Sequence, residues 1–192
     1  LNIVFEEMDN GILGGAWIDS YQTTKTTLEF GYTFPYKGTF KLNSTYPFSY
    51  STILHEIGHI LGIGTMWMDT SIQNRPINDN DPDNYYYTGV NAVREYKRYY
   101  EIRGGNPNDI IGIPIEDDFG NGTKHGHAEE GNASITIDNE VHNSNNDRKI
   151  GGKLHPGLGS ELMTGISNGA NELSRITIGF LEDIGWNVDY SK

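Results

Sequence analysis

The stretch that decides how the chain is interpreted is HEIGHILGIGT, residues 55–65. The pattern predicts a helix, and residues four apart on a helix project from the same face. His55 and His59 can therefore bind one metal ion through their imidazoles, and Glu56 can reach water on that ion without occupying a ligand position. The stretch predicts a metal site with a carboxylate suited to general-base catalysis.

This helix is expected to run from about residue 51 to residue 61. Apolar residues recur every four positions along it, and a serine is available to cap its start. Gly62 and Gly64 follow and can end it. These surroundings favour a zinc site of the peptidase type over a chance match on a core helix.

Two histidines do not complete a catalytic zinc site, which takes three protein ligands. In the commonest longer form of the motif, a third histidine stands where this chain has Thr65. Either the third ligand comes from elsewhere in the chain or the site is inactive. The candidates are the later histidines: His125, His127, His142 and His155.

Two segments resemble the metzincin clan of zinc endopeptidases: HEIGHILGIG and SELMTG. The chain is most similar to leishmanolysin-like metzincins and their bacterial and viral relatives, through GILGGAW, YTGVNAVREY and LSRITIGFLEDIGWNVDY. In this clan a methionine turn forms an apolar floor under the zinc, and the resemblance implies that role for Met163. Some metzincins carry a tyrosine ligand two residues after the methionine, but Gly165 stands there, so none is expected.

The leishmanolysin-like pattern also accounts for Thr65, because the third zinc histidine in that family follows an insertion of about sixty residues. His127, in GHAEE, fits this position, although alanine replaces the usual tryptophan after it. This choice makes residues 132–157 an insertion before the methionine turn. His155 is the alternative ligand, but it lies closer to Met163 than the family histidine does.

The resemblance further implies that an edge strand above the motif helix holds the substrate by backbone pairing. The candidate is ILGGAW, residues 12–17, with Leu13, Gly14, Gly15 and Ala16 as substrate-binding positions. The two glycines would let another backbone approach closely. An ordinary edge strand is the alternative.

We expect one domain over residues 1–192, with an α+β, metzincin-like zincin fold. An N-terminal subdomain, about residues 1–64, would pack a twisted mixed sheet on the motif helix. An irregular C-terminal subdomain, about residues 65–192, would contain the methionine turn and a final helix, with the active site in the cleft between the two. Outside the motif, the expected strands are residues 2–7, 11–18, 38–45 and 133–138, and the expected helices are residues 89–103 and 173–184.

The composition narrows the class of protein. A net charge of −12 argues against nucleic acid as a partner, because phosphate binding needs clustered basic residues. No apolar run reaches the roughly 18 residues that a membrane span needs, and there is no cysteine for disulfides or thiolate sites. We expect an extracellular, secreted or virion-associated protein. The start at LNIVFEE, without a signal peptide, suggests a processed or trimmed chain, and the oligomeric state stays open.

Calcium is a second candidate cofactor beside zinc. Two acidic loops offer the oxygen ligands that Ca²⁺ prefers, although neither has the EF-hand spacing. Solvated surface charge is the alternative explanation. The residues are Asp79, Asp81 and Asp83 in one loop and Glu116, Asp117 and Asp118 in the other.

The predicted function is that of a zinc-dependent endopeptidase, with Glu56 activating zinc-bound water and a protein or peptide as substrate. One alternative is a catalytically idle metzincin-like domain used for binding or assembly. The intact Glu56 argues against it, because a binding module has no need of that carboxylate. Another alternative is a zinc hydrolase that acts on a non-peptide amide.

Overall fold

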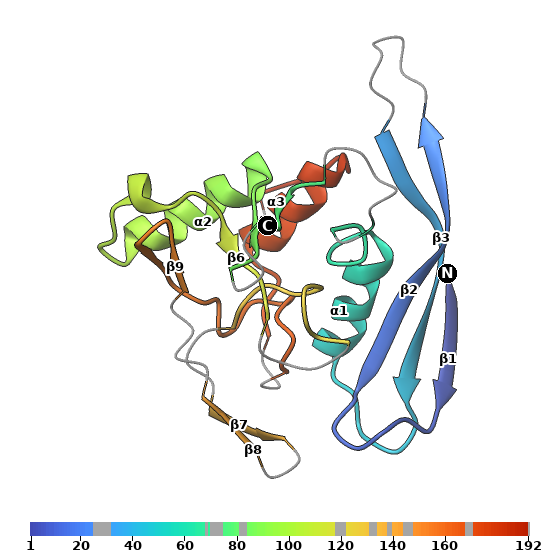
Figure 1. Ribbon diagram of the computed structural model, residues 1–192. Helices are drawn as coiled ribbons and strands as arrows, with labels where there is room; N and C mark the ends of the chain where they lie inside the picture. Colours follow the sequence, from blue (N-terminus) through green and yellow to red (C-terminus); the bar gives the residue numbers. More distant parts are fainter. Residues whose placement is uncertain are drawn as a thin grey trace.

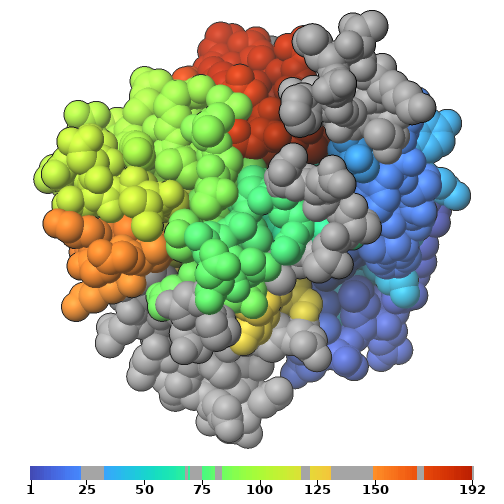
Figure 2. Space-filling view, turned by 45° about the horizontal axis from the view of Figure 1, so that its top comes forward, coloured from blue at the N-terminus to red at the C-terminus, as the bar shows by residue number. Residues whose placement is uncertain are grey.

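The computed structural model is an α+β fold with the N-terminal sheet on one side and most of the helical structure on the other (Figure 1). The same division is visible at the surface in Figure 2, where the sheet is blue and the α2 and α3 regions are green and red. No helix among the described residues is long and apolar enough to cross a membrane. The structure describes residues 1–24, 32–67, 69, 75–80, 84–117, 122–130, 134–137, 140–143, 148–167 and 171–191.

The N-terminal sheet is mixed, as predicted. Its strands are β1 (Asn2–Glu6), β2 (Gly14–Thr24) and β3 (Tyr32–Asn43), in the order β1-β3-β2. β3 pairs parallel with β1 and antiparallel with β2, so β2 is an edge of this sheet. The third strand begins earlier than residue 38, where the sequence placed it, because β3 continues beyond Gly38 alongside the second half of β2.

The motif helix, α1 (Tyr50–Ile60), packs on this sheet. Its start is capped by the Ser49 hydroxyl, which accepts a hydrogen bond from the Thr52 backbone N–H at 3.1 Å. Its apolar side chains face two cores: one side meets Phe40 and Leu42 of β3, while Leu54 packs against the C-terminal core. The chain leaves the helix through Gly62, whose φ of +110° is a conformation that suits glycine.

The C-terminal part contains two helices and several short strands. α2 (Val90–Ile102) and α3 (Arg175–Ile184) pack closely, since a Cβ added at Gly179 would lie 2.6 Å from the Cα of Ala92. The C-terminal subdomain, which was predicted to be irregular, holds more strand than the one segment expected there, residues 133–138. The short elements of this subdomain are β4 (Ile77–Asn78), β5 (Tyr86–Tyr87), the 3-10 helix η1 (Pro107–Asp109), β6 (Ile113–Pro114), β7 (Ser134–Ile137), β8 (Glu140–Asn143), β9 (Arg148–Ile150) and β10 (Lys153–His155).

The larger hydrophobic core lies in this C-terminal part. Trp67, Tyr87 and Phe180 are fully buried and contact one another through their rings at centroid distances of 4.7–5.0 Å. Met163 belongs to the same core. Trp186 follows α3, and its indole N–H donates a hydrogen bond to the Leu61 carbonyl at 2.8 Å. This bond connects the segment after α3 to the end of α1.

Candidate metal centre

Three imidazoles meet at one point. The Nε2 atoms of His55 and His59 are 2.9 Å apart, those of His59 and His127 3.0 Å, and those of His55 and His127 3.1 Å. Nitrogens held tetrahedrally at about 2.0–2.1 Å from one zinc ion lie roughly 3.3 Å apart, only slightly more than these separations. The cluster can therefore hold one metal ion.

The protonation state of the three imidazole rings also suits a bound cation. Each Nδ1 lies against a backbone carbonyl: that of Leu162 for His55 (2.7 Å), Ile63 for His59 (2.9 Å) and Thr123 for His127 (2.7 Å). A carbonyl only accepts hydrogen bonds, so each Nδ1 carries the proton and each Nε2 presents a lone pair. Burial lowers the pKa of all three histidines, that of His127 to about 3, which keeps the rings neutral. Three lone pairs at this spacing repel one another unless a cation lies among them.

His127 is held by short extended segments that the sequence pattern did not reveal. Its neighbour Ala128 bridges to Ile115 on one side and to Thr164 on the other. The Ala128 N–H donates to the Met163 carbonyl at 2.9 Å, and the His127 carbonyl accepts from Glu116 N–H at 3.0 Å. The third histidine is thereby fixed against both the methionine turn and the strand extension after β6.

Thr65, which occupies the third-histidine position of the commoner motif, has a structural role. Its hydroxyl donates to the His59 carbonyl at 2.7 Å, at the end of α1. Close by, a Cβ at Gly64 would lie 1.9 Å from the Gly126 carbonyl oxygen. This contact brings the segment that carries His127 directly against the end of the motif helix.

The other described histidines lie outside the cluster. His155 is fully buried, its Nε2 accepting from the Ile111 N–H at 3.1 Å and its Nδ1 lying 2.8 Å from the Lys153 carbonyl. Both ring nitrogens are thus engaged elsewhere, and the structure does not bring the alternative ligand His155 to His55 and His59. His125 stacks on Tyr85, with ring centroids 4.1 Å apart. The side chain of His142 lies outside what the structure describes.

Glu56 is buried beside the histidines, with 4 % of its surface exposed. Its Oε2 receives no hydrogen bond from the described residues, and burial raises the pKa of the carboxyl to about 8. A Cβ added at Gly14 would lie 2.5 Å from Glu56 Oε1. The glycine therefore makes room for the carboxylate between α1 and the start of β2.

The predicted substrate-binding positions lie at that same start of β2. Gly14, Gly15 and Ala16 pair with Leu42, Lys41 and Phe40 of β3, and the Leu13 carbonyl accepts from Asn43 N–H at 3.0 Å. No strand among the described residues pairs with the other side of β2.

Met163 lies beneath α1, fully buried. A Cβ at Gly58 would lie 2.5 Å from its sulfur, so the thioether packs against the helix next to His59. Gly165 leaves no space for a side chain, because a Cβ there would lie 1.9 Å from Thr123 Cγ2.

Sequence reasoning missed Glu161, which anchors the methionine turn. Its buried carboxylate accepts hydrogen bonds from the hydroxyls of Ser174 and Thr177 at the start of α3. Burial raises the pKa of this carboxyl. The sequence does contain a signal for this contact: Glu161 lies two residues before Met163, and the hydroxyl residues Ser174 and Thr177 lie at the start of the next helix.

The described residues include a second cluster that could hold a metal ion. It consists of Glu116, Asp117 and Glu129, and one carboxylate oxygen from each lies within 4.8 Å of the others. In the other acidic loop Asp79 is exposed and forms an ion pair with Arg75 at 2.9 Å. Asp81, Asp83 and Asp118 lie outside the described residues.

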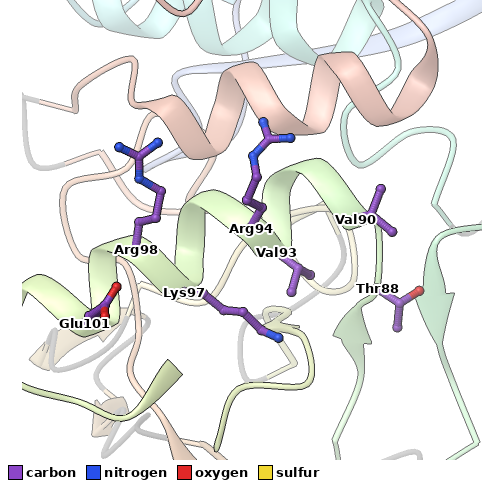
Figure 3. Close-up of a pocket in the computed structure, with 7 residues that line it drawn as sticks. All are labelled: Thr88, Val90, Val93, Arg94, Lys97, Arg98 and Glu101. Carbon is purple, nitrogen blue, oxygen red and sulfur yellow. The ribbon is translucent and has the colours of Figure 1, made fainter. Parts of the chain in front are cut away.

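A surface hollow runs along α2, away from these groups (Figure 3). None of the predicted site residues lines it. Its arginines are already engaged with carboxylates: Arg94 with Glu95 and Glu182, and Arg98 with Glu95. The lining residues are Thr88, Val90, Val93, Arg94, Lys97, Arg98 and Glu101.

Comparison of the chain with protein-family models gives no match, and comparison with curated proteins gives none either.

Proposed function

We propose that the chain is a zinc-dependent endopeptidase of the metzincin type, similar to the leishmanolysin-like branch. The observation that carries this proposal is the triangle of His55, His59 and His127 Nε2 atoms, with the buried Glu56 next to His55 in the same helix. Three imidazole ligands and a nearby carboxylate that does not belong to the ligand set are the parts that a zinc peptidase needs.

Zinc held by three imidazoles would polarise the scissile carbonyl and lower the pKa of its water. Glu56 then takes the proton of the attacking water and gives it to the leaving amine. Its unpartnered Oε2 is available for this proton transfer once the charge of a bound metal ion offsets the burial that raises the pKa of Glu56. The Nδ1 hydrogen bonds to backbone carbonyls hold the three rings with Nε2 forward, so little reorganisation is needed on metal binding.

The free side of β2 supports a peptide over a small amide as the substrate. An extended peptide can add to this edge by backbone hydrogen bonds, which are independent of side-chain identity. Gly14 and Gly15 allow that backbone to approach, and Gly14 directly abuts Glu56. A peptide bound there would pass close to the carboxylate.

The main rival is an idle domain used for binding or assembly, in a secreted or virion-associated setting. We propose the same setting for the active enzyme. A buried glutamate with an unpartnered oxygen destabilises a fold, so its presence beside three histidines favours catalysis over scaffolding.

The test is hydrolysis of a casein-type protein by the purified, zinc-loaded chain. We expect cleavage that a chelator stops and added zinc restores. Stoichiometric zinc without cleavage of any protein substrate would support the idle domain, and cleavage of small amides alone would support the non-peptide hydrolase.

A further inference from the structure

A cluster of carboxylates lies on the segments that hold His127, and it is separate from the histidine triangle. Oxygens of Glu116, Asp117 and Glu129 all lie within 4.8 Å of one another. Oxygens bound to one calcium ion at about 2.3–2.6 Å are at most roughly 4.6–5.2 Å apart. The three side chains can therefore surround a single ion without rearrangement of the backbone.

Glu130 supplies a second, independent observation. Only 3 % of its surface is exposed, and neither carboxylate oxygen receives a hydrogen bond from the described residues. The charged groups that act on it are the carboxyls of Glu116 and Glu129. Burying a carboxyl among other carboxyls is unfavourable unless a cation neutralises them or a proton is shared between them. Glu130 is thus a buried carboxyl close enough to Glu116 and Glu129 to feel their charge.

We propose that Glu116, Asp117, Glu129 and Glu130 bind one Ca²⁺ ion. Four carboxylates and no nitrogen or sulfur ligand form a hard donor set, which selects calcium or magnesium over zinc. Magnesium demands near-octahedral geometry and keeps several waters, whereas calcium accepts irregular sets of protein oxygens. Glu116, Glu129 and Glu130 are buried, which leaves little room for water and favours calcium.

The ion would tie together the two segments that position the third histidine. Glu116 N–H donates to the His127 carbonyl, and Glu129 N–H donates to the Pro114 carbonyl, each at 3.0 Å. A calcium ion between the side chains of Glu116 and Glu129 clamps these paired segments from one side. Calcium therefore acts as a structural ion that keeps His127 in place, and its binding does not depend on zinc chemistry.

The experiment is a calcium titration of the purified, zinc-loaded protein in calcium-free buffer, followed by calorimetry and thermal unfolding. We expect one Ca²⁺ per chain and a rise in Tm of roughly 5–10 °C at about a hundredfold excess over Kd. Magnesium at the same concentration should give a much smaller rise. Zinc is counted separately by metal analysis, so a failure of the zinc proposal is distinguishable from a failure of this one.

Two variants locate the ion. Glu130→Gln keeps the shape but removes one charge, so we expect at least a tenfold weaker Kd for calcium. Its Tm without calcium should equal or exceed that of the parent, because the amide can donate to neighbouring carboxylates. Asp79→Asn is the matched control from the other acidic loop and should keep the parental Kd, since Asp79 is exposed and paired with Arg75.

A parent protein that binds no calcium and shows no rise in Tm would overturn the proposal and indicate carboxyls that share a proton. Equal calcium affinity in the parent and in Glu130→Gln would overturn it too, because the ion would then lie elsewhere. Should Glu130→Gln fail to fold, Asp117→Asn at the half-buried ligand gives the same comparison.

Discussion

Glu56 and Gly14 show at the scale of single residues how a backbone position sets the space around a buried carboxylate. The carboxylate is buried against the start of β2, where only a glycine leaves it space. The sequence predicted Gly14 as a substrate-binding position, because a glycine lets another backbone approach closely. Its closest contact, however, is with Glu56, which a sequence pattern cannot reveal because the two are far apart along the chain.

Glu56→Gln should retain stoichiometric zinc and lose about 10²–10⁴-fold in kcat, since an amide cannot accept the proton of the water. Peptide hydrolysis and metal analysis of the same preparation check both parts. Activity within tenfold of the parent would show that another group is the base.

Gly14→Ala should lower kcat/KM by at least about tenfold with zinc retained, because the new methyl group displaces the carboxylate that lies 2.5 Å from its position. Gly15→Ala is the control, since a Cβ there meets only Met8 Cε at 3.9 Å. Equal losses in the two variants would assign the effect to substrate pairing along β2 and not to Glu56.

At the scale of elements, the site is assembled from α1, the segment around His127 and the methionine turn. Leu162 gives its carbonyl to His55, Met163 packs under Gly58, and Glu161 binds the start of α3. The turn therefore connects the three histidines to the C-terminal core.

Met163→Leu should keep stoichiometric zinc, because the sulfur packs against the helix and is not part of the ligand set. A swap of similar volume in a core costs less than about 1.5 kcal/mol, so Tm should fall by no more than roughly 6 °C. Met163→Ala should be clearly less stable, by about 2–5 kcal/mol. Loss of zinc from the leucine variant while its fold is intact would contradict this account.

At the scale of the whole molecule, a buried ion-pair group joins α2 to α3. Glu95 is 3 % exposed and accepts from Arg175 Nε at 2.8 Å and Arg94 Nε at 2.9 Å. Burial alone would raise the pKa of Glu95, but the hydrogen bonds from the two arginines outweigh it and lower the pKa. The stabilisation is therefore complete above the unfolded value of 4.5 and is lost as pH falls through the lower folded pKa.

Glu95→Gln should thus unfold more easily than the parent at pH 7, and the difference should shrink as the pH is lowered below 4.5. Denaturant unfolding of both proteins at several pH values measures this. A difference that stays constant down to pH 2 would mean that the charge of Glu95 does not contribute.

The sequence predicted the local features of the molecule well: the motif helix with its histidine pair, the mixed sheet and the helices near residues 89–103 and 173–184. Predictions of this kind depend on hydrophobic periodicity and capping residues that lie close together in the sequence. Nothing local singled out His127, which needed a family resemblance, because the bridges from Ala128 to Ile115 and Thr164 that hold it are long-range. Glu161 was hidden for the same reason, and so were Glu129 and Glu130 near the predicted calcium candidates Glu116 and Asp117, since burial of a carboxylate depends on tertiary packing.

The most direct test of the central claim is a crystal structure of the zinc-loaded protein, with anomalous scattering measured at the zinc absorption edge. The account predicts one strong peak about 2.0–2.1 Å from the Nε2 atoms of His55, His59 and His127, with Glu56 beside it but not bonded. A zinc peak bonded to His155, or none at the histidine triangle of a protein that contains stoichiometric zinc, would contradict it.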